Sequence, residues 1–137
     1  MLTQDQLDQL KKYFATQPVE VVYLFGSQAT GKTNKLSDID IGVLFKENLS
    51  DSTCFDLRVK MTADLSGISK TDQVDVVDLE KAPIALRYSA ISPKKEILTV
   101  NNNRRAVFEA ETNSRYFDYS YYIKENTKNS LVSIARM

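Results

Sequence analysis

Short runs of β-branched and aromatic residues alternate along the chain with segments whose apolar residues have helical spacing. The runs VEVVYLF, DIDIGVLF and QVDVVDL are typical of buried strands, and the segment from Lys95 to Val100 is a weaker strand candidate. The pattern therefore predicts strands over residues 19–25, 38–45, 73–79 and 95–100. Residues 26–37 are rich in Gly, Ser, Thr, Asn and Lys, and we expect a turn or loop there.

Helical spacing predicts a first helix over residues 3–15, with Thr3 as its N-cap. A second helix begins at Ser50 or Asp51 and carries along one face the residues Cys54, Leu57, Met61, Leu65 and Ile68. A short third helix runs from Pro83 to Ile91. We expect Asn101 to Asn103 to turn the chain and the remainder to be helical.

This order of elements predicts an α/β fold of the α+β type, with one small mixed sheet flanked by helices. The chain has 137 residues and shows no linker, repeat or low-complexity block. We therefore expect a single domain over residues 1–137, with a core at about 19–100 and a C-terminal helical segment at about 104–135.

Composition excludes several kinds of chemistry. The chain has no histidine, which excludes Ser-His-Asp and Cys-His catalysis, and its single cysteine, Cys54, excludes an intramolecular disulfide and a cysteine-built zinc site. Eighteen basic residues balance eighteen acidic ones, which argues against direct nucleic-acid binding by a basic surface. The sequence shows neither a membrane span nor a signal-peptide core, so we expect a cytoplasmic protein in a reducing compartment.

Residues 26–33, GSQATGKT, match the P-loop pattern G-x-x-x-x-G-K-[ST] and follow a predicted strand. A P-loop directs backbone amides and the N-terminus of a long helix at phosphate. Only four residues separate Thr33 from Asp38, which allows about one helical turn, roughly 6 Å. Because a crossover helix needs about 10–12 residues, the short connection favours an antiparallel or sharply turned pair of strands instead.

The same segment carries a second pattern, Gly26-Ser27 followed after ten residues by Asp38-Ile39-Asp40. Alternate residues of a strand share a face, so Asp38 and Asp40 lie side by side while Ile39 faces the core. Two neighbouring carboxylates repel each other unless a cation lies between them, and oxygen ligands favour Mg²⁺ or Mn²⁺. The alternative is an exposed sheet edge that carries solvated acids.

Asp75 completes this metal site if the strand over residues 73–79 neighbours the strand over residues 38–45. Asp78 lies three residues after Asp75 and therefore points to the opposite face. For Asp78 we expect a role in a loop or at a helix end.

Gly26-Ser27, Asp38-x-Asp40 and Asp75 together resemble the polymerase-β-type nucleotidyltransferases, and most closely their minimal nucleotidyltransferase domains. The similar segments are YLFGSQATGKTNKLSDIDIGVLF, residues 23–45, and VDVVDLEKAP, residues 74–83, so the resemblance covers roughly residues 19–100. It implies the fold of that superfamily, two Mg²⁺ ions held by the catalytic residues Asp38, Asp40 and Asp75, and ATP as substrate. Gly26 and Ser27 would grip the phosphates, with Lys32 as a further phosphate contact.

Members with this short layout are often antitoxins encoded beside a HEPN-type ribonuclease toxin. The resemblance implies transfer of AMP from ATP to a tyrosine of that toxin, with the two proteins forming a hetero-oligomer. Other relatives modify small molecules such as aminoglycosides. Many relatives have Arg where this chain has Gln28, which keeps open a third hypothesis, an antitoxin of weak catalytic power that neutralises its partner by binding alone.

The C-terminal segment is rich in tyrosine, with Tyr116, Tyr119, Tyr121 and Tyr122 close together. One interpretation is a surface for partner binding or base stacking, because tyrosine is enriched at interfaces. The other is a helix that packs its aromatic side on the sheet, and we expect this second arrangement. Helical spacing places Tyr119 and Tyr122 on one face, with Tyr121 elsewhere.

Overall fold

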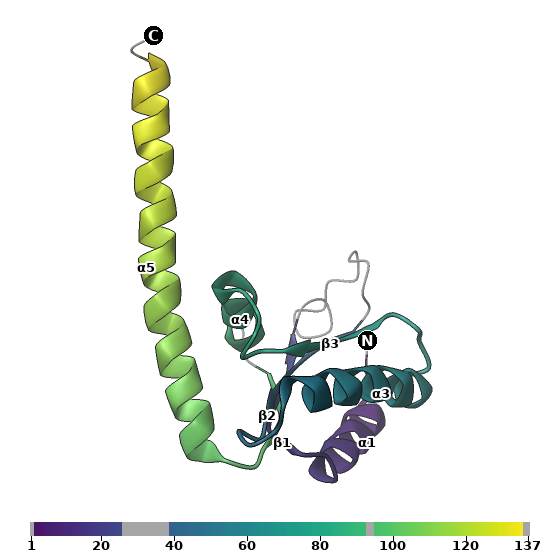
Figure 1. Ribbon diagram of the computed structural model, residues 1–137. Coiled ribbons are helices and arrows are strands. Elements are labelled where there is room, and N and C mark those ends of the chain that lie inside the picture. Colours follow the sequence, from purple (N-terminus) through teal and green to yellow (C-terminus); the bar gives the residue numbers. More distant parts are fainter. Residues whose placement is uncertain (1, 26–38, 93–94, 136–137) are drawn as a thin grey trace.

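The computed structural model describes residues 2–25, 39–92 and 95–135, and helices and strands alternate in it in the predicted order (Figure 1). The elements are α1 (Gln4–Ala15), β1 (Val19–Phe25), β2 (Ile39–Phe45), α3 (Asp51–Ser69), β3 (Val74–Asp78), α4 (Ile84–Ile91), β4 (Glu96–Thr99) and α5 (Asn102–Ala135). Within these ranges, no helix combines the length and the apolar character that a bilayer span requires.

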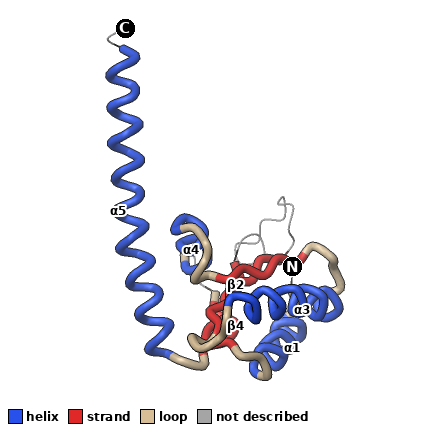
Figure 2. The backbone as a smooth tube through the Cα atoms, in the orientation of Figure 1, coloured by secondary structure: helices blue, strands red, loops and turns tan. Residues whose placement is uncertain are grey.

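The described strands, drawn red in Figure 2, form one mixed sheet, and their order in it is β3-β2-β1-β4. β1 pairs antiparallel with β2 and with β4, whereas β2 pairs parallel with β3. The prediction of a small mixed sheet flanked by helices is confirmed, and β2 and β1 occupy its centre. The antiparallel pairing of β1 with β2 agrees with the short connection between them in the sequence.

Side-chain caps begin the two helices that cover one face of the sheet. Thr3 forms a capping box with Gln6 at the start of α1, in which each residue's side chain accepts from the other's backbone N–H. The Ser50 hydroxyl caps α3 by accepting from the backbone N–H of Thr53. Both helices then bury their predicted apolar face, which includes Leu10 and Phe14 of α1 and Cys54, Met61 and Leu65 of α3.

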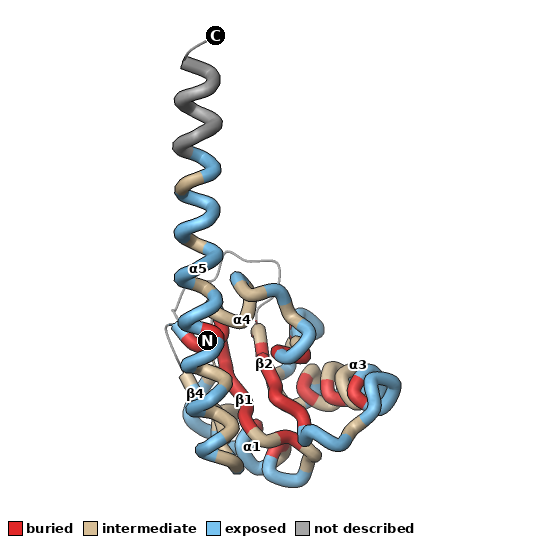
Figure 3. Tube along the Cα trace, turned by 60° about the vertical axis from the view of Figure 1, so that its left-hand side comes forward, coloured by how far each residue is buried: buried red, intermediate tan, exposed pale blue. Residues whose placement is uncertain are grey.

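The sheet separates two hydrophobic layers (Figure 3). Ile39, Ile41 and Val43 of β2 pack on the side of α1 and α3. Leu44 and Tyr23 belong to the other layer, together with Ala90 and Ile91 of α4 and with Phe108 of α5 at its margin. Because successive strand residues point to opposite faces, Asp40 and Gly42 of β2 lie on the α4 and α5 side with Leu44.

The start of α5 differs from the prediction of a turn over three asparagines. Asn101 caps the helix, since its side-chain oxygen accepts from the backbone N–H of Arg104 at 3.0 Å. Asn102 and Asn103 already belong to the first turn. The Asn101 side chain thus satisfies one of the free amides of the first turn, and the helix begins directly after it.

The expectation that the tyrosine-rich side of the last helix packs on the sheet is wrong. Tyr116 stacks on Tyr88 of α4, with ring centroids 3.8 Å apart, and does not lie on the sheet. Tyr119, Tyr121 and Tyr122 are exposed. The cause is the length of α5, which continues well past α4 and the sheet (Figure 1).

Gly42 allows a close approach at the centre of the sheet. A Cβ atom added at this position would lie 2.9 Å from both Cδ atoms of Leu79, a distance that carbon atoms do not tolerate. Leu79 is fully buried and follows β3, so its side chain has little room to move. By contrast, a Cβ atom added at Gly67 of α3 would meet no atom within 4 Å.

We expect opposite effects from alanine at the two glycines. Gly42→Ala should lower the free energy of unfolding by about 1–3 kcal/mol because it overpacks the core against Leu79. Gly67→Ala should raise it by about 0.5–1 kcal/mol because alanine favours a helix over glycine. Urea unfolding followed by circular dichroism measures both, and an unchanged stability in Gly42→Ala would show that the contact with Leu79 is not tight.

Candidate active site

Asp40 lies at the end of the sheet where β1 finishes and β2 begins. It is the second residue of β2 and pairs with Phe25, the last residue of β1. Its neighbours Ile39 and Ile41 are buried on the α1 and α3 side, which places the half-buried Asp40 on the opposite face. The prediction that the isoleucines face the core is confirmed, and Asp40 is held in place by the buried strand on which it lies.

Asp75 lies directly across from Asp40 in the parallel pairing of β2 with β3. Neighbouring strands are about 4.8 Å apart, and paired residues point to the same face, so the two carboxylates are adjacent. Asp75 is exposed at the edge strand of the sheet. The condition stated for Asp75, that its strand should neighbour the strand of Asp40, is therefore met.

The other predicted site residues, Gly26, Ser27, Lys32 and Asp38, lie outside the described residues. In the described part of the chain, no three acidic, histidine or cysteine side chains gather as a metal site would need. Asp40 and Asp75 supply two carboxylates there, and Asp38 is the third ligand expected from the sequence. Carboxylate oxygens from adjacent strands suit Mg²⁺, which binds few protein ligands and retains water and phosphate oxygens. The residues present thus fit the metal that the resemblance implies.

The strand geometry opposes the P-loop interpretation of GSQATGKT. In P-loop proteins the strand before the loop and its sheet neighbours run parallel, with a helix crossing over between them. Here the strands on either side of the segment are β1 and β2, and they run antiparallel. The segment joins the two strands at the end of the sheet that carries Asp40.

Asp78 has a structural role at the end of β3, as expected. The side chain is buried, and its Oδ1 atom accepts from the backbone N–H of Glu80 at 3.1 Å, which shapes the turn that leads to α4. Burial raises the pKa of the Asp78 carboxyl, and the nearby cations of Lys81 and Arg58 partly offset this. The alternation along β3 directs Asp78 away from the face of Asp75, so it takes no part in the carboxylate pair.

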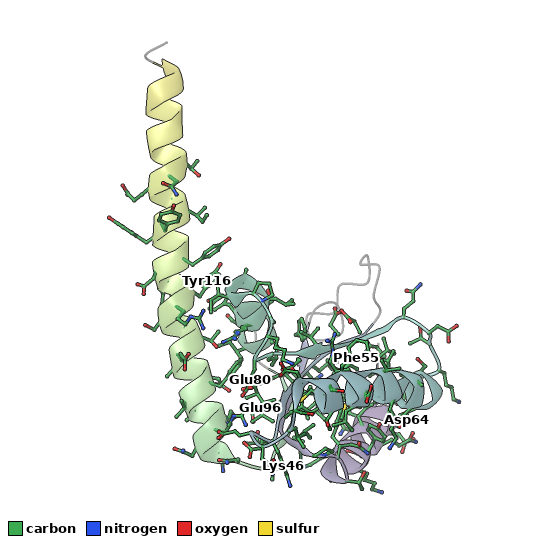
Figure 4. The ribbon with its side chains drawn as sticks, viewed as in Figure 1. Lys46, Phe55, Asp64, Glu80, Glu96 and Tyr116 are labelled. Atoms are coloured by element: carbon green, nitrogen blue, oxygen red, sulfur yellow. The ribbon has the colours of Figure 1, made fainter. Side chains whose placement is uncertain are left out.

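A second polar region lies at the opposite end of the sheet, and the sequence analysis did not identify it. Arg104 donates from Nη1 to Glu20 of β1 and to the carbonyl oxygen of Phe45 at the end of β2, both at 2.9 Å. It also pairs with Glu80, which is labelled in Figure 4. These contacts tie the start of α5 to three segments of the sheet layer.

A cleft of about 440 Å³ beside Arg104 is lined by charges of both signs, Arg87, Arg104, Arg115, Glu47, Glu80 and Glu111 among them. The positive and negative side chains balance, and neither Asp40 nor Asp75 is among the lining residues. The sequence does not indicate the contacts of Arg104, because its partners come from distant parts of the chain.

Comparison with known proteins supports the resemblance. The family model described as polymerase beta, nucleotidyltransferase matches residues 8–103, which include both described carboxylates. A curated relative, the protein adenylyltransferase MntA of Shewanella oneidensis, is 30% identical over 98 residues. That alignment covers 72% of this chain and 66% of MntA, so the chain spans just under two-thirds of the relative's length.

Solved structures share the fold at lower sequence identity. A chain of the toxin–antitoxin MntA-HepT has a TM-score of 0.69 at 22% identity, and covers 94% of this chain and 99% of its own. A chain from the complex of the tri-AMPylated Shewanella oneidensis HEPN toxin with its MNT antitoxin has a TM-score of 0.69 at 21% identity, with coverage of 95% and 99%. A toxin–antitoxin structure with AMP-PNP gives 0.66 at 24% identity, again with coverage of 95% and 99%.

The fold, the paired carboxylates and the match over residues 8–103 agree with one another. This chain therefore belongs to the polymerase beta nucleotidyltransferase family.

Proposed function

We propose that this chain is a Mg²⁺-dependent nucleotidyltransferase that transfers AMP from ATP to a tyrosine hydroxyl of a HEPN-type toxin, and so acts as its antitoxin. The observation that carries the proposal is the pairing of Asp40 with Asp75, at the end of the sheet where β1 finishes and β2 begins. The name of MntA, a protein adenylyltransferase, supports the type of reaction. The complexes of similar chains with HEPN toxins support the class of partner. The proposed unit is a single domain in the cytoplasm, where ATP is available.

The proposed site has two groups of residues, one that binds metal ions and one that binds phosphates. Asp38, Asp40 and Asp75 hold two divalent cations, Mg²⁺ or Mn²⁺, on the sheet face that α4 and α5 also cover. When bound, Mg²⁺ neutralises charge on the triphosphate and makes the acceptor hydroxyl more acidic. The amides of Gly26 and Ser27, with the Ser27 hydroxyl and Lys32, bind the β- and γ-phosphates. The absence of a side chain at Gly26 lets the backbone approach them closely.

The reaction forms one bond and breaks another at the α-phosphorus of ATP. The acceptor oxygen attacks in line, the bond from the α-phosphorus to the bridging oxygen breaks, and pyrophosphate leaves. Asp75 lies at the exposed edge, where an acceptor can reach it, and it orients the hydroxyl and helps to remove its proton. No histidine is needed for any of these steps.

Gln28 favours one alternative, neutralisation of the toxin by binding alone. An arginine at this position would add a positive charge near the phosphates, and the chain lacks it. Transfer to a small molecule, such as an aminoglycoside, is the other alternative, and both give distinct results in the experiment below.

Transfer of label from [α-³²P]ATP to a cognate HEPN-type toxin tests the proposal. The wild-type chain should label the toxin in the presence of Mg²⁺, and EDTA should abolish the labelling. Asp40→Asn should reduce the rate at least about a hundredfold, because it removes a negatively charged metal ligand at constant size. Asp72→Asn is the matched control, since it removes an exposed carboxylate just before β3.

Label in the toxin with wild type and the Asp72 variant, but not with the Asp40 variant, supports the proposal. Neutralisation of the toxin without any label would establish the binding-only alternative. Label that appears only on an added aminoglycoside would show that the acceptor is a small molecule.

Thermal melting distinguishes the proposed site from a P-loop. Mg²⁺-ATP should raise the melting temperature of the wild-type chain, because it binds the folded state and relieves the repulsion between Asp40 and Asp75. Asp40→Asn should lose most of this increase, whereas Lys32→Ala should lose only part of it. Loss of the whole increase in Lys32→Ala, with the increase retained in Asp40→Asn, would contradict the site assignment.

A further inference from the structure

α5 runs along β1 in the same direction as the strand. Arg104 pairs with Glu20 near the start of β1, and Glu109 accepts a hydrogen bond of 2.7 Å from the hydroxyl of Tyr23 nearer its end. β1 finishes two residues later at Phe25, opposite Asp40. The helix continues to Ala135, so its distal part passes the end of the sheet that carries the carboxylate pair (Figure 1).

One face of α5 holds the helix against the rest of the molecule. Phe108 packs at the margin of the hydrophobic layer on that side of the sheet, and Thr112 is buried. Tyr116 stacks on Tyr88 of α4, with an angle of 5° between the rings, and Figure 4 labels it. These residues follow each other at intervals of four, as one face of a helix requires.

The same face continues beyond α4, where no described residue covers it. Tyr119 and Ile123 lie three and seven positions after Tyr116, and Tyr122 borders them. Their exposed fractions are 43%, 44% and 63% for Tyr119, Ile123 and Tyr122. We call these three residues the distal face. A helix face that is partly or fully covered in its first half and exposed in its second is typical of a surface completed by another molecule.

The position of the distal face indicates which molecule completes it. It continues the face that packs on α4, on the side of the sheet where Asp40 lies, and it extends past the end of the sheet that carries the carboxylate pair (Figure 1). A molecule seated there lies beyond α4, at the end of the molecule that carries the proposed site. α5 comprises 34 of the 137 residues, so the 95% coverage by the chain solved with a HEPN toxin includes most of this helix. The long helix is thus part of a fold that is found with a toxin bound.

We propose that the distal face is the docking surface for the protein that accepts AMP, which rests on the function proposed above. The partner contributes a helix or groove with aliphatic side chains, into which Tyr119 and Tyr122 insert as aromatic anchors. Docking at this point holds the acceptor hydroxyl close to Asp40 and Asp75. The surface therefore selects the protein substrate, while the carboxylates act on it.

Paired substitutions on the two sides of α5 test the proposal. Tyr119→Asp/Ile123→Asp alters the distal face, and Phe117→Asp/Tyr121→Asp is the matched control on the other side of the helix. The control residues are more exposed, at 63% and 68%, and both variants add two aspartates to the same helix. A general effect of charge or helix weakening would therefore be at least as large in the control.

Calorimetry measures the affinity for the cognate HEPN-type toxin, and the KM for toxin and the melting shift with Mg²⁺-ATP are measured beside it. The distal-face variant should bind the toxin at least about tenfold more weakly and show a raised KM for toxin, while its shift with Mg²⁺-ATP stays that of the wild type. The control variant should match the wild type in all three measurements.

Unchanged toxin affinity in the distal-face variant would overturn the docking proposal, as would an equal loss in the control. A wild-type dimer that only the distal-face variant disrupts, without change in toxin affinity, would assign the face to a second copy of this chain and also overturn it. Failure of the function proposed above gives a different result, namely no labelling of the toxin by the wild-type chain even where the toxin binds.

Discussion

The parallel pairing of β2 with β3 is the contact on which the proposed site depends. It places Asp40 opposite Asp75, two carboxylates that would repel each other without a cation between them. The strands tolerate the repulsion between these carboxylates because their other residues are buried in the core. Ile39, Ile41, Val74 and Val76 all lie in the layer beneath α1 and α3. Burial of one face of the strands thus holds the charges in place on the other.

Close packing also stabilises the face of the sheet that carries Asp40 and Asp75. Gly42 follows Asp40 on that face and admits Leu79, which helps to seal the layer under α4. Tyr23 donates to Glu109, and burial together with this carboxylate raises the pKa of the Tyr23 hydroxyl, so the phenol remains protonated and the bond to α5 is kept. A buried layer next to the paired carboxylates would support a metal-dependent site, because packed side chains hold the strands that carry the ligands in place.

α5 connects this support to a surface outside it. Arg104 anchors the first turn to Glu20, Glu80 and the end of β2, and Tyr116 is the last residue with a described aromatic partner on α4. The anchored half gives the helix a defined direction relative to Asp40. The second half can then present its exposed aromatic residues at a fixed place beyond α4, which a flexible tail would not do.

Local patterns were enough to predict most of the elements and the face of its strand on which Asp40 lies. β1 has the predicted bounds, Thr3 and Ser50 cap the helices as expected, and the alternation in DIDIGVLF placed Asp40 opposite the buried isoleucines. These features depend on residues within a few positions of one another, where backbone geometry dictates which side chains share a face. The exception was Asn102, because whether an asparagine turns the chain or enters a helix depends on which residue caps it.

Local patterns do not show which distant segments of the chain become neighbours in the folded structure. From the sequence, Asp75 could be placed beside Asp40 only on the condition that their strands are neighbours. The pairing of β2 with β3 joins segments that are separated by all of α3. For the tyrosine-rich part of α5, the helical spacing predicted an aromatic side that packs on the sheet. In the structure Tyr116 stacks on Tyr88 of α4, and Tyr119, Tyr121 and Tyr122 beyond it are exposed. The period of a helix reports which residues share a face, and the length of the neighbouring element decides how much of that face is covered.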